Sequence, residues 1–118
     1  MSSSLSDTLA DLRQQFAAQL PARVVAINTQ AQSLNLAAWH PVEAEALHRL
    51  VQHLTNSAGM FGMQSVSEAA CALEARLATL LKTGAAPTEV EWQALRTDLD
   101  RMNQQARTLY AIECPETV

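Results

Sequence analysis

The stretch that decides the fold is residues 47–62, which read Leu-His-Arg-Leu-Val-Gln-His-Leu-Thr-Asn-Ser-Ala-Gly-Met-Phe-Gly. Its apolar residues recur every three or four positions, at Leu47, Val51, Leu54, Ala58 and Phe61. This spacing lines one side of an α-helix and does not fit the two-residue period of a strand. Pro41 suits the first turn of that helix, and Gly59 and Gly62 indicate its end. The stretch therefore predicts one amphipathic helix.

The segments on either side carry the same helical period. Apolar runs over residues 5–20 and 24–34 precede the central helix, with Pro21 predicted to interrupt them. A further run over residues 66–80 follows and is closed by Gly84. The last run, over residues 92–109, is opened by a Thr88–Glu91 capping box. Short connections favour antiparallel neighbours. The expected fold is all-α: an antiparallel up-down four-helix bundle with an additional N-terminal helix in residues 1–113, followed by a tail or linker in residues 114–118.

Composition narrows the class of function. The chain has 118 residues, enough for one domain with a sizeable core, and its 48% hydrophobic and 4% aromatic content favours helices. Its net charge of -4, with eight basic residues and no basic stripe, argues against nucleic-acid binding. No apolar run approaches the roughly 18 to 20 residues that span a bilayer, so no membrane partner is expected.

The cysteines and histidines predict no metal or cofactor site. Cys71 and Cys114 fit no metal-binding spacing, and Cys71 is expected to be a buried, reduced thiol within an apolar helix. His48 and His53 are five positions apart, so they do not share a helical face as metal ligands should. Reduced cysteines make the cytoplasm the expected compartment.

Residues 47–62 resemble the motif of histidine-containing phosphotransfer (HPt) domains of bacterial two-component phosphorelays. That motif reads approximately His-x-Leu-Lys-Gly-Ser-Ala-Gly-x-Leu-Gly, and the residues that match it as they stand are Leu54, Ser57, Ala58, Gly59 and Gly62. The resemblance is strongest over residues 47–76. It implies a helical bundle that binds a response-regulator receiver domain. It also implies similarity to HPt modules fused to output domains such as diguanylate cyclases.

The sequence departs from the motif at the phosphoacceptor. The ungapped register places Gln52 where the family has its histidine, Thr55 at the usual lysine and Asn56 at a usual glycine. An amide nitrogen has no lone pair comparable to that of imidazole, so Gln52 cannot accept a phosphoryl group. The resemblance therefore implies a module that docks a receiver without carrying phosphate itself.

Helix geometry predicts which residues share the side of Gln52. At about 100° per residue, one flank of the core stripe holds His48, Gln52, Thr55, Asn56 and Gly59. Together with Gln64, these residues are the predicted receiver-docking surface. Gly59 lies two turns beyond Gln52 and is expected to leave the surface low for an approaching domain.

Two alternatives remain open from the sequence. His53 is the candidate phosphoacceptor if the chain is an active phosphotransfer protein, which requires a local shift of register between residues 54 and 57. The chain is otherwise a purely structural helical adapter or dimerisation module, which would use Met60, Phe61 or the N-terminal helix. Phosphotransfer through a histidine is the only group-transfer chemistry that the sequence suggests.

Overall fold

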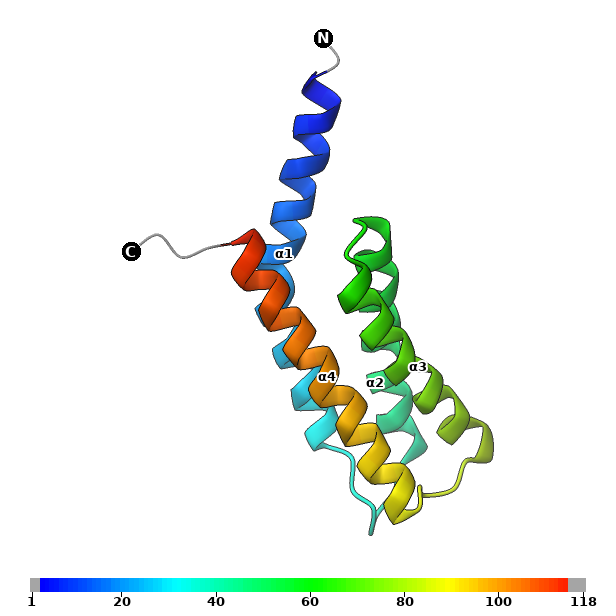
Figure 1. The fold of residues 1–118 in the computed structure, drawn as a ribbon. Coiled ribbons are helices and arrows are strands. Elements are labelled where there is room, and N and C mark those ends of the chain that lie inside the picture. The colour runs from blue at the N-terminus through cyan, green and yellow to red at the C-terminus, as the bar shows by residue number, and fades with distance from the viewer. Residues whose placement is uncertain (1–2, 115–118) are drawn as a thin grey trace.

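The structure is a computed structural model that describes residues 3–114, and this part of the chain forms four helices and no strand. These are α1 (Ser3–Gln32), α2 (Pro41–Met60), α3 (Gln64–Thr83) and α4 (Glu89–Glu113). α1 and α3 each contact both α2 and α4. The connections lie at alternate ends of the molecule (Figure 1). The predicted all-helical class is confirmed, whereas most of the predicted tail, residues 115–118, lies outside the described residues.

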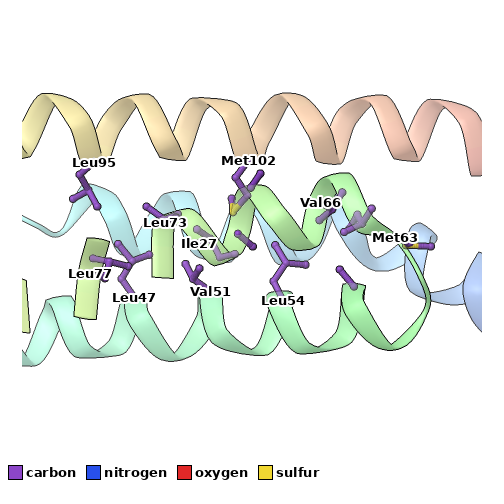
Figure 2. Packing of buried hydrophobic residues seen from close by; sticks show 14 of the residues in the cluster. Ile27, Leu47, Val51, Leu54, Met63, Val66, Leu73, Leu77, Leu95 and Met102 are labelled. Carbon is purple, nitrogen blue, oxygen red and sulfur yellow. The ribbon is translucent and has the colours of Figure 1, made fainter. Parts of the chain in front are cut away.

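Apolar side chains from all four helices meet in one core (Figure 2). The largest of them are less than 2% exposed: Leu20, Ile27, Leu47, Val51, Leu54, Val66, Leu73, Leu77 and Met102. Burial of each such side chain stabilises the fold by roughly 1.5–3 kcal/mol. Of the stripe predicted from residues 47–62, Leu47, Val51, Leu54 and Ala58 are buried, together with Ala44, whereas Phe61 follows the end of α2 and is half-buried, so this helix is oriented as the sequence indicated.

The predicted break at Pro21 is wrong, because α1 continues through it without interruption. A proline inside a helix costs about 3 kcal/mol, since it removes one hydrogen bond and crowds the preceding turn. Phe16 and Leu20 before Pro21 and Ile27 after it are all at least 97% buried, on the same side of α1. Their combined burial outweighs that cost, and Pro21 itself is exposed. The expected additional N-terminal helix is therefore not found as a separate helix, because its residues form the first part of α1.

The N-terminal part of α1 extends beyond the other helices (Figure 1). With 30 residues against 20 in α2, α1 is about 15 Å longer at 1.5 Å per residue. Residues 7–12 are all exposed, including Leu9 at 55% and Leu12 at 41%. Phe16 is the first buried side chain of α1 among those described. Residues 7–12 thus contribute little to the core.

The end of α2 is fixed by contacts with distant parts of the chain. Gly62 adopts a left-handed backbone conformation with φ of 70°, and the N–H of Met63 donates to the Ala58 carbonyl at 2.8 Å. Arg13 of α1 donates to the Phe61 carbonyl at 2.9 Å and pairs with Glu113 of α4 at 3.0 Å. Arg13 therefore ties the α2–α3 turn to both α1 and α4.

The predicted capping box at the start of α4 is confirmed. The Thr88 side chain accepts from the Glu91 N–H at 3.2 Å, and the Glu91 carboxylate accepts from the Thr88 N–H at 2.8 Å. Hydrogen bonding with Thr88 lowers the pKa of Glu91 below its ordinary value of 4.5. The bond with the Thr88 backbone is the larger cause, and the bond with the Thr88 side chain is the smaller. The stabilisation from the ionised carboxylate is present above its unfolded-state pKa and is lost as the pH falls through the lowered folded-state pKa.

We expect Thr88→Ala to lower the free energy of unfolding by about 1 kcal/mol at pH 7, because the N-cap acceptor of α4 is lost. Urea unfolding followed by circular dichroism measures this. An NMR titration of the Glu91 carboxyl carbon should show its pKa rising part of the way toward 4.5, since the backbone bond from residue 88 remains. Thr88→Ser, which keeps a hydroxyl acceptor, is the matched control. Equal stability of all three proteins would contradict the role of the cap.

Candidate functional site

Helix α2 presents two outward flanks on either side of its buried stripe of Ala44, Leu47, Val51, Leu54 and Ala58. One flank borders α3, because the Thr55 carbonyl accepts a hydrogen bond from Ser67 Oγ at 3.2 Å. The other flank borders α1, because the Phe61 ring stacks on Phe16 with centroids 5.4 Å apart. The sequence-predicted candidates are divided between these flanks.

The flank beside α3 holds the residues predicted for receiver docking on α2. Gln52, Asn56 and Gly59 are exposed, whereas His48 and Thr55 are half-buried. Seven residues separate Gln52 from Gly59, which places them within about 20° of one another around the helix. We call His48, Gln52, Thr55, Asn56 and Gly59 the Gln52 face. The open part of this face consists of its exposed residues: the amide side chains of Gln52 and Asn56, and Gly59, which has no side chain.

Gly59 also has a packing role that the sequence did not reveal. A Cβ atom at this position would lie 3.4 Å from Ser67 Oγ on α3, at the tight limit of ordinary contact. The Thr55 hydroxyl, one turn earlier, donates to the Val51 carbonyl of its own helix at 3.0 Å. Small residues at 55, 59 and 67 therefore let α2 and α3 approach closely. The flatness of the Gln52 face is partly a consequence of this packing.

Gln64, the remaining residue predicted for docking, lies beyond the Gly62 turn. Its amide donates to Glu68 at 2.8 Å, and it is exposed. With Arg13 and the α4 residues Gln105 and Thr108 it lines a cavity of about 290 Å³. The structure thus associates Gln64 with the α3–α4 side of the molecule, and we leave it outside the Gln52 face.

His53 lies on the flank that borders α1, not on the Gln52 face. It is exposed, and α2 is an uninterrupted α-helix from Pro41 to Met60, without the register shift that would bring His53 to the position of Gln52. Six residues separate His53 from Gly59, so the two point about 120° apart around the helix. The nearest equivalent of Gly59 for His53 is Met60, which is 79% exposed. A domain approaching His53 would meet this bulky side chain.

The edge of α3 beside the Gln52 face carries a thiol and a carboxylate. Cys71 and Glu74 follow Ser67 by about one and two helical turns, so they continue the α2-facing side of α3. Because the chain reverses at Gly62, Glu74 lies alongside an earlier part of α2 than Ser67 does. The prediction that Cys71 is buried is wrong: Cys71 is exposed, because its neighbour Ala70 takes the core position.

The Gln52 face has hydrogen-bonding groups but no nucleophile in its open part. The Gln52 and Asn56 amides can each donate and accept, and neither can form a bond to phosphorus. No group of three or more histidine, cysteine, aspartate or glutamate side chains between residues 3 and 114 is placed to hold a metal ion. No helix in this range is long and apolar enough to cross a membrane. The arrangement is suited to recognition of a partner surface.

Comparisons of the chain with protein-family models, with curated proteins and with solved structures gave no match.

Proposed function

We propose that this chain is an HPt-like signalling module that docks a response-regulator receiver domain through the Gln52 face without accepting phosphate. The supporting observation is an exposed amide at the motif's histidine position, in line with Gly59 on an uninterrupted helix. In this proposal the four helices form the antiparallel up-down bundle of that family. The module is free-standing or fused to an output domain such as a diguanylate cyclase.

The shape of the Gln52 face supports docking of a folded domain. Because Gly59 has no side chain and Thr55 is half-buried against α3, the surface around Gln52 and Asn56 is low. Exposed amides can donate to and accept from a partner's backbone groups without the desolvation cost of a buried charge. The close packing of α3 against α2 holds this surface in place, so little conformational entropy is lost when a partner binds.

Phosphate acceptance is absent from this proposal because of the chemistry of the available groups. Transfer requires a lone pair on an imidazole nitrogen to form a nitrogen–phosphorus bond while the bond from phosphorus to the aspartate carboxylate breaks. Gln52 has no such lone pair, and His53 points about 100° away around the helix. His48 is half-buried one turn before Gln52, a less accessible position for an incoming phosphoryl group.

A receiver-binding experiment with a bulky substitution tests the docking face. We expect isothermal titration against purified receiver domains from the source genome to identify at least one that binds. Asn56→Trp, which places a large side chain beside Gln52, should weaken that binding at least tenfold. Gln104→Trp on the exposed side of α4 is the matched control and should bind as the wild type does. If both variants weaken receiver binding equally, or if neither weakens it, the Gln52 face is not the docking site.

A second candidate function is a structural adapter that associates through apolar surface at one end of the molecule. Met60 and Ile112 are 79% and 68% exposed, and Leu9 on the protruding part of α1 is 55% exposed. Phe61, which the sequence also suggested for this role, packs against the core instead. Light scattering after size exclusion separates the two functions. A monomer at high protein concentration that binds a receiver excludes the adapter, whereas a stable dimer without receiver binding favours it.

A further inference from the structure

We infer, on the basis of the proposed function, that the Gln52 face binds its receiver without assistance from the receiver's phosphoryl group. Phosphorylation of the receiver then leaves the complex equally strong or weakens it. The inference concerns regulation of the docking site, and it rests on where the chain's cations lie.

The only arginine or lysine on α2 is Arg49, which lies seven residues before Asn56 and therefore within about 20° of it around the helix. Its guanidinium contacts the Glu45 carboxylate at 2.7 Å, and both side chains are more than half exposed. Thr55 stands where the motif has its lysine, and its hydroxyl is bonded to the Val51 carbonyl. The Gln52 face therefore contains no arginine or lysine, and the charge of Arg49 beside it is offset by Glu45.

The neighbouring helix adds negative charge to this surface. Arg76 of α3 turns away toward α4, where its Nε lies 2.5 Å from the Asp98 carboxylate, and Lys82 lies in the last turn of α3. Glu74 is on the α2-facing edge of α3, and Glu45 is on α2 itself. The remaining cations belong to α1 and α4: Arg13, Arg23, Arg96, Arg101 and Arg107. The chain as a whole has a net charge of -4.

A phosphoryl group needs a recognition chemistry that this face lacks. Proteins bind phosphate with arginine or lysine side chains or with the free N–H groups at helix N-termini. Gln52 lies three turns into α2, where the backbone N–H groups are already bonded within the helix. The Gln52 and Asn56 amides can donate to a phosphoryl oxygen, but they donate to an unmodified carboxylate equally well. The roughly two added negative charges of a phosphoryl group would meet one arginine, Arg49, and two carboxylates, Glu45 and Glu74, so we expect them to add no net attraction here.

The affinity of one receiver in two states tests the inference. A receiver that binds the chain is titrated in Mg²⁺ buffer alone and with beryllofluoride, a stable mimic of phosphoryl aspartate. We expect the dissociation constant to be unchanged or raised by beryllofluoride. A threefold or greater fall in the dissociation constant would overturn the inference while leaving the proposed docking intact. Absence of binding in both states, across the receivers of the source genome, would reject the proposed function itself.

A variant with an added positive charge should show the phosphoryl-dependent binding that the wild type lacks. Asn56→Lys adds a cation on the Gln52 face, so beryllofluoride should now lower the dissociation constant of that variant at least threefold. Gln104→Lys on α4 adds the same charge at a distance and should behave as the wild type does. An equal fall of the dissociation constant in both lysine variants would show that net charge, not this face, governs the effect. No fall in either variant would show that a cation on this face does not interact with the phosphoryl group. Each of these results would overturn the inference.

Discussion

Gln52→His is expected to give a chain that accepts a phosphoryl group, whereas we expect no phosphohistidine on the wild type. The exposed position on an uninterrupted helix, in line with Gly59, would then carry an imidazole nitrogen that can attack phosphorus. Incubation with a phosphorylated receiver, followed by detection of acid-labile phosphate on the chain, measures the change. The double variant Gln52→His, Thr55→Lys should transfer faster, because it also restores the motif's cation.

Variants of His53 supply the controls for this gain of function. His53→Ala in the wild-type background should leave phosphate acceptance at background, and His53→Ala combined with Gln52→His should retain the gained activity. Robust acid-labile phosphate on the wild type that disappears in His53→Ala would reverse the assignment in favour of the active alternative. If neither Gln52→His nor Gln52→His, Thr55→Lys accepts phosphate, although both show native circular dichroism and bind the receiver, the phosphoryl group does not reach residue 52.

Leu73→Ala is expected to cost about 2–5 kcal/mol in free energy of unfolding, the largest stability effect that we predict. Leu73 is fully buried on α3 and belongs to the core cluster shown in Figure 2, where it lines one hollow with Leu47 of α2 and Leu95 of α4. Truncation removes apolar burial and leaves a cavity that helices anchored elsewhere cannot readily close. Chemical unfolding of wild type and variant, with the midpoint and slope compared, gives the difference.

Leu9→Ala is the matched control for this loss. The same substitution on the exposed, protruding part of α1 should change the free energy of unfolding by no more than about 0.5 kcal/mol. A loss above 2 kcal/mol at Leu9 would mean that this stretch is covered, for example by a second copy of the chain. A loss below 1 kcal/mol at Leu73 would contradict the core described for α3.

Local signals were sufficient to predict most of the helical layout. Pro41 begins α2, Gly84 ends α3 in the left-handed conformation, and Thr88 with Glu91 opens α4, all as the sequence indicated. Each of these signals acts within a few residues, through a hydrogen bond or a backbone conformation that depends on the local residue type. The helix boundaries at these three positions are therefore readable without knowledge of the fold.

Predictions that depend on packing were less secure. Pro21 was expected to separate two helices because its local cost is real, yet burial on both sides of it keeps α1 continuous. Cys71 was expected to be buried because its neighbours are apolar, yet Ala70 occupies the core position and Cys71 faces outward. In both cases the outcome depends on which side of the helix the other helices cover.

The sequence predicted which α2 residues share the candidate site but not which residues of the other helices border it. Helical spacing alone places His48, Gln52, Thr55, Asn56 and Gly59 on one flank of α2. It could not show that Ser67 of α3 packs against Thr55 and Gly59, because these residues are 12 and 8 positions away along the chain. Nor could it separate Gln64 from the others, since the Gly62 turn directs the chain toward α4.

The sequence by itself determined the residue ranges of α2, α3 and α4 and the residue, Gln52, that stands where the motif it resembles has a histidine, since caps, periodicity and residue identity are local properties. Only the tertiary structure decided that α1 runs unbroken through Pro21 and that Arg13 holds the α2–α3 turn against Glu113, a hundred positions away. It also decided that the flank with Gln52 lies against α3. The physical reason is that burial and long-range pairing depend on which helices are neighbours, and no short stretch of sequence specifies that.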